Sequence, residues 1–175
     1  MHKIPTMFER DENAPGHPVK NAIKQECRWV ADGDGYASRK LDGMNVKIEG
    51  GVLFKRRKPL RGDYDEASYV RCSRDDPADK YLFQAFDHTE YGDGVYEAIG
   101  PKIQGNPEHQ TTHFLVCITP PETALRLIDP PRDFDGLRDW LADPEHDVEG
   151  VVWHHQDGRM AKIKKRDFGI RRGNR

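Results

Sequence analysis

The chain of 175 residues lacks any apolar run approaching the roughly 20 residues that a membrane-spanning helix needs. Its first twenty residues lack the apolar core of a secretory signal peptide. Its cysteines, Cys27, Cys72 and Cys117, are few, odd in number and widely spaced, which argues against a disulfide framework and a paired-cysteine zinc site. These absences lead us to expect a cytoplasmic protein without a membrane partner.

The composition is polar, with 35% hydrophobic residues, 33% charged residues and a mean hydropathy of −0.89. A net charge of −2 is not that of a strongly basic nucleic-acid binder, but the charges are segregated. Seven basic residues and one acid lie in 162–175, and a second basic cluster runs from Lys55 to Arg61. Such clusters form either a local positive face or merely a solvated tail and turn, and charge alone leaves both interpretations open.

Short apolar runs between turn residues predict a strand-rich fold. We expect strands at 28–31, 36–41, 45–49, 52–56, 95–99, 114–118, 151–154 and 160–164. Helical spacing predicts a helix over 79–86 and another around 137–141, the latter capped by Asp135. The expected class is α+β, with residues 1–20 as a loosely ordered N-terminal arm and 21–175 as a single domain.

The stretch Lys40-Leu41-Asp42-Gly43 places a lysine at the end of a predicted strand, just before an acid and a glycine. The glycine allows the backbone to turn tightly beside a ligand, and a lysine held there is a possible covalent nucleophile. Taken alone, the pattern is more often a surface lysine before an Asp-Gly turn.

Three later segments add charged groups to otherwise apolar strands. Glu97 lies inside the strand expected at 95–99, and Glu149 directly precedes the strand expected at 151–154. Lys162 and Lys164 alternate with apolar residues, so both side chains lie on one side of a strand. Burying two unpaired charges would be costly, and this side is therefore expected to line a polar cleft or to contact water.

In this order, these pieces resemble the covalent nucleotidyltransferase superfamily of ATP-dependent ligases and capping enzymes. Lys40–Gly43 matches its lysine-x-aspartate-glycine motif, and the later segments match its later motifs in order. The stretch Tyr96–Pro107 is similar to RNA ligases in particular, although Tyr96 stands where the family often has glycine. Over about residues 25–170 the chain most resembles a small 5′-to-3′ RNA ligase family. The resemblance implies an ATP-grasp-like nucleotidyltransferase domain, with antiparallel sheets flanked by helices around an ATP cleft. Few residues follow Lys164, so no C-terminal oligonucleotide-binding barrel is expected.

The resemblance also implies roles for individual residues. Lys40 would form a lysyl-AMP, with Lys162 and Lys164 as further catalytic residues at the α-phosphate. Glu149 would hold Mg²⁺ or Mn²⁺. The other ATP-binding positions would be Asp42, Gly43, Arg56 or Arg57 for a phosphate or the ribose, Glu97 for a ribose hydroxyl, and Phe114 stacked on adenine. RNA phosphates would be held by Lys55, Lys58, Arg166, Arg171 and Arg172.

The expected function is ATP-dependent joining of an RNA 5′-phosphate to a 3′-hydroxyl through a 5′-adenylylated RNA. The alternatives are a DNA nick ligase or an mRNA guanylyltransferase, and, in another class, a non-catalytic RNA-binding domain. The expected lack of a barrel disfavours the first two, and the intact nucleophile motif disfavours the third. No histidine pair has a recognised metal-ligand spacing, so His154 and His155 are expected to be surface or wall residues. The oligomeric state stays open.

Overall fold

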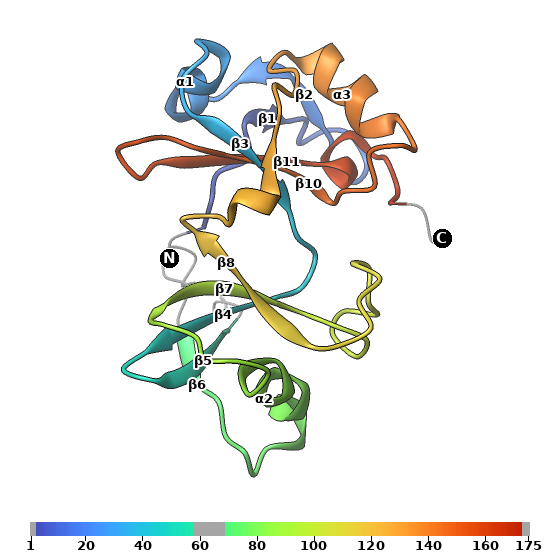
Figure 1. Ribbon diagram of the computed structural model, residues 1–175. Helices are drawn as coiled ribbons and strands as arrows, with labels where there is room; N and C mark the ends of the chain where they lie inside the picture. Colours follow the sequence, from blue (N-terminus) through green and yellow to red (C-terminus); the bar gives the residue numbers. More distant parts are fainter. Residues whose placement is uncertain (1–2, 58–68, 173–175) are drawn as a thin grey trace. The chain divides into compact units, whose positions relative to one another are not determined.

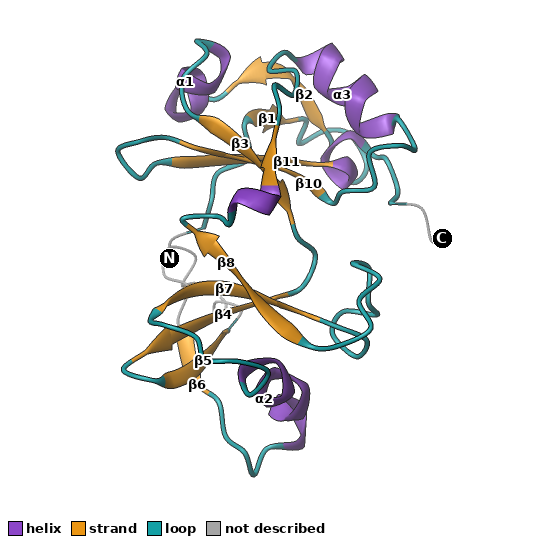
Figure 2. Ribbon diagram, viewed as in Figure 1, coloured by secondary structure: helices purple, strands orange, loops and turns teal. Residues whose placement is uncertain are grey.

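The computed structural model describes residues 3–57 and 69–172 and has the α+β class expected from the sequence, with mostly antiparallel sheets and few helices. Its chain forms two compact units, each with its own core. Unit 1 is built on Asp42–Glu122, and unit 2 combines Ile4–Leu41 with Thr123–Arg175. Figure 1 labels the elements of both units, and Figure 2 distinguishes their strands from their helices.

In its described residues, unit 1 is a five-stranded antiparallel sheet with the order β6-β5-β4-β7-β8 and one covering helix. Gly50 and Gly51 close the β4–β5 hairpin with φ values of 57° and 70°, as their sequence predicts. The core face of the sheet packs against the helix through a shared apolar cluster that includes Leu82 and Ala85. The elements are β4 (Met44–Glu49), β5 (Val52–Arg56), β6 (Tyr69–Arg71), β7 (Gly94–Ile99), β8 (Phe114–Thr119), the 3-10 turn η2 (Pro77–Asp79) and helix α2 (Lys80–Phe86).

Unit 2 contains a four-stranded antiparallel sheet with the order β11-β10-β3-β9, beside a two-stranded β1–β2 ribbon. One face of the larger sheet joins Phe8, Trp29 and Leu141 in a single core. The strands are β1 (Phe8–Arg10), β2 (Val19–Ile23), β3 (Tyr36–Lys40), β9 (Arg126–Leu127), β10 (Gly150–His154) and β11 (Met160–Lys164). The helical elements are η1 (Gln25–Cys27), α1 (Arg28–Ala31), η3 (Thr123–Leu125), α3 (Phe134–Ala142) and η4 (Lys165–Phe168).

Two local expectations about helices are wrong. Residues 28–31 form α1 rather than a strand, because the chain continues from η1 and the Asp32 N–H bonds back to the Arg28 carbonyl at 3.1 Å. An apolar run of this length does not by itself distinguish a strand from a helix. Helix α3 is capped by Asp133, whose carboxylate accepts from the Gly136 N–H at 2.8 Å. Asp135 instead lies in the first turn and pairs with Arg138.

The N-terminal segment, which the sequence suggested as a loose arm, carries β1 and two buried core residues, Met7 and Phe8. The Met7 N–H bonds to the Lys162 carbonyl at 2.8 Å, and the Lys162 N–H bonds to the Pro5 carbonyl at 2.9 Å. These bonds form a parallel bridge between Thr6 and Lys162. The segment therefore provides hydrogen-bond partners for the backbone of Lys162 at the outer edge of β11.

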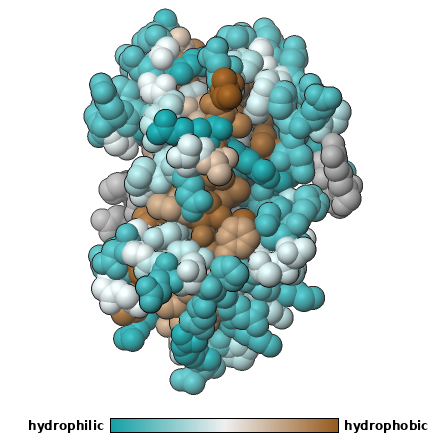
Figure 3. All heavy atoms as spheres, in the orientation of Figure 1, coloured by the Kyte–Doolittle hydropathy of each residue, from teal (hydrophilic) through white to brown (hydrophobic). Residues whose placement is uncertain are grey.

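Most of the face shown in Figure 3 is covered by hydrophilic side chains, in keeping with the low mean hydropathy. Within 3–57 and 69–172, every helix is too short or too polar to cross a bilayer.

Gly150 is required by close packing between β10 and β11. A Cβ at this position would overlap the Ile163 carbonyl and lie 2.8 Å from the Lys164 Cα, and backbone cannot move aside as a side chain can. Gly150→Ala is expected to lower the free energy of unfolding by about 1–3 kcal/mol, the usual range for overpacking. Urea unfolding measures this loss of free energy. Gly92→Ala is the control, because a Cβ at Gly92 meets nothing within 4 Å. Equal losses in the two variants would contradict this packing role.

Candidate active site

The three lysines singled out in the sequence lie on one face of the four-stranded sheet of unit 2. Gly150 of β10 pairs with Lys40 of β3 on one side and with Lys164 of β11 on the other. Lys162 pairs with Val152, one step further along the same face. We call this face, opposite to the apolar core, the lysine face. The expectation that Lys162 and Lys164 share a side is confirmed by this register.

Lys40 occupies the last position of β3 and is held by two oxygens. Its Nζ donates to Glu149 Oε2 at 2.5 Å and to the Leu41 carbonyl at 3.1 Å. Glu149 directly precedes Gly150, so the strand pairing of β3 and β10 brings this carboxylate to the lysine from a position 109 residues away. The sequence identified both residues, but it did not predict their ion pair.

Lys162 and Lys164 lie in a poorly solvated, positively charged environment. Burial, reinforced by the charges of Lys164 and Lys40, lowers the pKa of Lys162 to about 8. Burial also lowers the pKa of Lys164, although the Asp167 carboxylate acts in the opposite direction. Only 6% of the Lys164 surface is exposed, so this lysine is less accessible than the expected polar cleft or water contact implied.

Asp167 is a buried carboxylate that fixes the end of β11. It accepts from the Lys164 N–H at 2.9 Å and from the Arg10 guanidinium at 2.6 Å. Arg10 comes from β1, so the N-terminal segment holds both the edge of β11 at Lys162 and the acid that anchors Lys164. Neither Arg10 nor Asp167 was identified from the sequence, since no local pattern links residues so far apart.

In unit 1, two carboxylates hold the backbone just after Lys40. Glu97 accepts from the Gly43 N–H at 3.1 Å, and Glu108 accepts from the Asp42 N–H at 2.9 Å. A Cβ on Gly43 would overlap the Ala98 carbonyl and lie 2.8 Å from Ile99, which explains the glycine. Glu108 was not among the residues singled out in the sequence, where its only signal was its place just after the stretch 96–107.

The register also places the other nucleotide-binding candidates of unit 1. Glu97 of β7 pairs with Asn45 and Val116, and Phe114 lies two residues before Val116, so Glu97 and Phe114 share the face opposite to the core. Arg56 of β5 pairs with Tyr69, whose hydroxyl donates to Asn45 Oδ1 at 2.6 Å.

Arg56 and Arg57 differ in their place on unit 1. Lys55, the residue before Arg56, lies on the core side, which puts Arg56 on the face of Glu97. Arg57 follows the end of the strand and is exposed. Of the two arginines, Arg56 is therefore the one that the strand places on the same face as Glu97.

The basic residues expected to bind RNA have different surroundings. Lys55 donates to the buried Asp79 at 2.5 Å and to Asp76 at 3.3 Å, which raises the pKa of Lys55. Arg172 pairs with Asp147 at 3.0 Å. Arg166 and Arg171 are exposed, and Lys58 lies outside the described residues.

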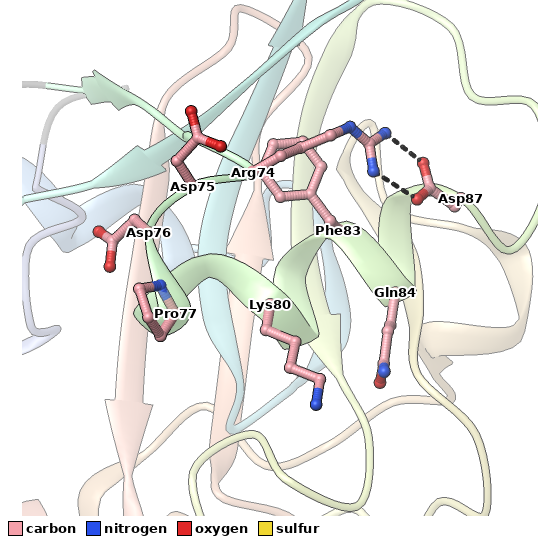
Figure 4. A pocket seen from close by; sticks show the side chains of 8 residues that line it. All are labelled: Arg74, Asp75, Asp76, Pro77, Lys80, Phe83, Gln84 and Asp87. Carbon is pink, nitrogen blue, oxygen red and sulfur yellow. Dashed lines mark hydrogen bonds and ion pairs between the residues drawn. The ribbon is translucent and has the colours of Figure 1, made fainter.

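A surface pocket of unit 1 contains none of the motif residues. It lies beside α2, where Arg74 crosses the Phe83 ring at 4.3 Å and forms two hydrogen bonds to Asp87 (Figure 4). Lys80 and Gln84 also line the pocket. Within the pocket, Arg74 and Asp87 neutralise each other, and Asp76 pairs with Lys55 outside it.

Glu149, which pairs with Lys40, is the carboxylate that the described residues offer to a divalent cation on the lysine face. Among residues 3–57 and 69–172, no cluster of three or more His, Cys, Asp or Glu side chains is arranged to hold a metal ion. Mg²⁺ is commonly held by one or two carboxylates together with substrate phosphates and waters. The donor set therefore fits an ion that arrives with a phosphate ligand rather than a metal caged by protein alone.

The chemistry of the lysine face suits attack on a phosphoryl group. It combines a primary amine at a strand end, a carboxylate 2.5 Å away and two further cationic side chains. Fixed cations stabilise the negative charge of a phosphoryl-transfer transition state, and an amine is a competent nucleophile once it is unprotonated.

The chain is similar to proteins of a known family. The model of the RNA ligase 1 family matches residues 63–174, a range that does not include Lys40. A protein from Danio rerio named RNA ligase 1 is 34% identical over 82 residues, which cover 43% of this chain and 24% of that protein. A Mus musculus protein of the same name is 27% identical over 162 residues, covering 87% of this chain and 46% of that protein. The chain thus spans less than half the length of the curated relatives it matches.

Proposed function

This chain belongs to the RNA ligase 1 family, and from that premise we propose that it is an ATP-dependent RNA ligase with Lys40 as its nucleophile. It joins a 5′-phosphate to a 3′-hydroxyl through lysyl-AMP and a 5′-adenylylated RNA. The observation that carries the proposal is the single sheet face on which Lys40, Lys162 and Lys164 lie with Glu149. The fold that corresponds to this activity is the nucleotidyltransferase domain.

The first step transfers AMP to the protein. The ammonium of Lys40 first gives up a proton, because a protonated amine has no electron pair for attack, and Glu149 Oε2 is within hydrogen-bonding reach of that proton. The neutral amine attacks the α-phosphorus of ATP. A nitrogen–phosphorus bond forms, the bond to the bridging oxygen of the β-phosphate breaks, pyrophosphate leaves, and the nitrogen loses a second proton. Lys162 and Lys164 neutralise the phosphate oxygens during this exchange.

The second and third steps act on the RNA. An oxygen of the RNA 5′-phosphate attacks the phosphorus of lysyl-AMP, and the nitrogen–phosphorus bond breaks as Lys40 regains its protons. The 3′-hydroxyl then attacks the activated 5′-phosphate, loses its proton, and releases AMP. A bound Mg²⁺ or Mn²⁺ would be held by Glu149 with ATP phosphates and would supply positive charge against the phosphate oxygens.

Incubation with α-labelled ATP or GTP, followed by a denaturing gel, tests the proposal. A labelled protein band that resists boiling in detergent and is released by acid is the expected result, because a phosphoramidate is acid-labile. A wild-type protein that takes label from neither nucleotide would leave the non-catalytic RNA-binding alternative standing.

The pKa of Lys162, lowered to about 8, predicts how adenylylation depends on pH. As pH rises through about 8, Lys162 in the free protein loses its charge and with it the contact to the α-phosphate. Lys162→Arg keeps its charge throughout this range, although its different shape lowers the absolute rate. The ratio of variant to wild-type rate constants, measured with subsaturating ATP between pH 7 and 9.5, is expected to rise about thirtyfold. Lys20→Arg, at an exposed position, provides the control. A ratio that stays flat would contradict a charged role for Lys162.

The substrate is expected to be RNA ends that carry a 5′-phosphate and a 3′-hydroxyl, with weaker use of all-DNA ends. A protein distinguishes RNA from DNA at a given position through the 2′-hydroxyl. Matched RNA, DNA and chimeric ends are compared in single turnovers with pre-adenylylated protein. Equal rates on RNA and DNA would overturn the substrate assignment and leave AMP transfer untouched.

The same assay examines the basic surface after β11. Combined Arg166→Ala and Arg171→Ala substitutions are expected to slow end joining several-fold, more than self-adenylylation, and to reduce the loss of rate with added salt. These two arginines are preferable to Arg172, whose pairing with Asp147 makes its removal structurally disruptive. Arg138→Ala on α3 is the matched control, because Arg138 is exposed and pairs with neighbours in its own helix.

A further inference from the structure

The lysine face continues past the three lysines to a second polar group. Along β3, Ser38 and Tyr36 follow Lys40 at alternate positions and so lie on the same face. The register sets three rows across the sheet: Lys164–Gly150–Lys40, then Lys162–Val152–Ser38–Arg126, then Met160–His154–Tyr36. The first and third rows are separated by four residues, or about 13 Å of strand.

His154 is a buried titratable group that the proposed reaction does not use. Only 7% of its surface and 3% of that of Ser38 are exposed. Its ring stacks on Tyr36 at a centroid distance of 5.3 Å, and the Arg126 guanidinium lies 4.2 Å from the centre of the Tyr36 ring. A histidine this well enclosed has a fixed ring orientation.

The contacts of Ser38 determine which ring nitrogen carries the proton. The Ser38 hydroxyl lies 3.4 Å from the Val152 carbonyl and 2.8 Å from His154 Nε2. A hydroxyl has one proton, and a carbonyl only accepts. Both contacts are hydrogen bonds only if Ser38 donates to Val152 and His154 Nε2–H donates to Ser38. Nδ1 is then a bare acceptor, and no residue of the described ranges donates to it.

The surroundings keep this acceptor unprotonated. Burial, with a smaller effect of the Arg126 charge, lowers the pKa of His154 to about 4. At neutral pH the ring is therefore uncharged, and Nδ1 offers an electron pair rather than a proton.

We propose that His154, oriented by Ser38, accepts a hydrogen bond at Nδ1 from the exocyclic amino group of the base of the nucleotide that reacts with Lys40, and so selects ATP over nucleotides with a carbonyl at that position. The inference rests on the proposed function. The apolar side chain of Val152 lies in the row between Lys40 and His154. A nucleotide whose phosphate reaches the Lys40 amine crosses this row, and its base edge reaches the third.

The choice of adenine follows from the chemistry of the acceptor. Adenine presents an amino donor where guanine presents a carbonyl acceptor. When two acceptors face each other in a poorly hydrated place, neither has a hydrogen-bond donor, and the binding affinity typically falls about tenfold or more. Ser38 and His154 therefore favour ATP in two ways: Nδ1 of His154 binds an amino group, and it disfavours a base that carries a carbonyl at that position.

The experiment compares ATP with inosine triphosphate, which carries a carbonyl in place of the 6-amino group, and with purine riboside triphosphate, which carries only hydrogen there. The measured quantity is the second-order rate constant for covalent nucleotidylation of the whole chain. Wild-type protein is expected to prefer ATP over the inosine nucleotide by about tenfold or more, with the purine riboside in between. His154→Phe keeps a ring against Tyr36 but removes both nitrogens, and it is expected to reduce the preference to within twofold.

Ser38→Ala serves as the second variant, because it removes the hydroxyl that fixes the tautomer of His154 and leaves the ring in place. It should reduce the preference for ATP partially. His155→Phe is the matched control: His155 contacts Trp29 and Asp157, and its substitution is expected to leave the preference unchanged. The purine riboside rate reports whether each variant is folded and competent.

A preference that persists in both His154→Phe and Ser38→Ala, or a wild-type protein that uses ATP and the inosine nucleotide equally, would overturn the inference while the ligase proposal stands. Absence of any covalent nucleotide on the wild-type protein would overturn both.

Discussion

Lys40→Ala is expected to lower covalent AMP transfer by more than about a thousandfold, because it removes the nucleophile itself rather than a group that assists it. Lys40→Arg is expected to fail equally. Its guanidinium preserves a positive charge beside Glu149, but it stays protonated and cannot attack phosphorus. The pair of variants therefore separates a nucleophile from a mere counter-ion. Quantified label from α-labelled ATP measures both.

Lys47→Ala provides the control for this experiment, since Lys47 pairs with Glu49 on unit 1 and has no part in the proposed site. Circular dichroism and thermal unfolding establish that each variant is folded. Equal labelling of Lys40→Ala and wild type would show that another group accepts AMP and would remove the basis of the proposed mechanism. Label retained by Lys40→Arg alone would show instead that only a charge is needed here.

Glu149→Ala is expected to reduce lysyl-AMP formation about a hundredfold, the scale of losing one well-placed electrostatic group. The carboxylate has one proposed function at Lys40, which it holds at 2.5 Å and whose proton it can accept, and another as the ligand of the divalent cation. Glu149→Gln distinguishes them when it is combined with a Mg²⁺ titration, because an amide still accepts a hydrogen bond from Lys40 but neither takes its proton nor binds Mg²⁺ well. If the metal function dominates, Glu149→Gln is as defective as Glu149→Ala, and both need more Mg²⁺ for half-maximal rate.

Glu145→Gln, an exposed neighbour in the same loop, is the matched control for the charge change. An unaltered Mg²⁺ titration with a normal maximal rate in Glu149→Ala would mean that Glu149 only precedes the strand and has no role in catalysis. A normal Mg²⁺ midpoint with a reduced rate in Glu149→Ala would restrict its role to holding Lys40.

The sequence predicted which residues share the lysine face within a strand, but not which strands lie side by side. Alternation alone puts Lys162 and Lys164 on one side of β11. That β10 lies between β3 and β11, so that Glu149 reaches Lys40, depends on pairing across more than a hundred residues, which no local pattern encodes. The burial of Lys164 follows from the same long-range arrangement.

A similar limit explains why two adjacent residues of the basic cluster Lys55–Arg61 have different surroundings. The β4–β5 hairpin was predictable, and it implies that Lys55 and Arg56 lie on opposite faces. Which face is the core depends on the position of α2 and on the buried Asp79 that holds Lys55. The charge cluster alone therefore suggested RNA contact for a lysine that is engaged inside unit 1.

The interruption of unit 2 by unit 1 has a consequence for the order of folding during synthesis. Nearly all of unit 1 is the continuous stretch Asp42–Glu122, which has a core of its own, so we expect it to fold before the rest of the chain is synthesised. Ile4–Leu41 must wait for β10 and β11, because Thr6 and Arg10 find their partners only at Lys162 and Asp167. Contacts of such sequence separation form slowly. The core around Met7 and Phe8 is therefore completed only when Val151, Trp153, Ala161 and Ile163 of the last two strands have been synthesised.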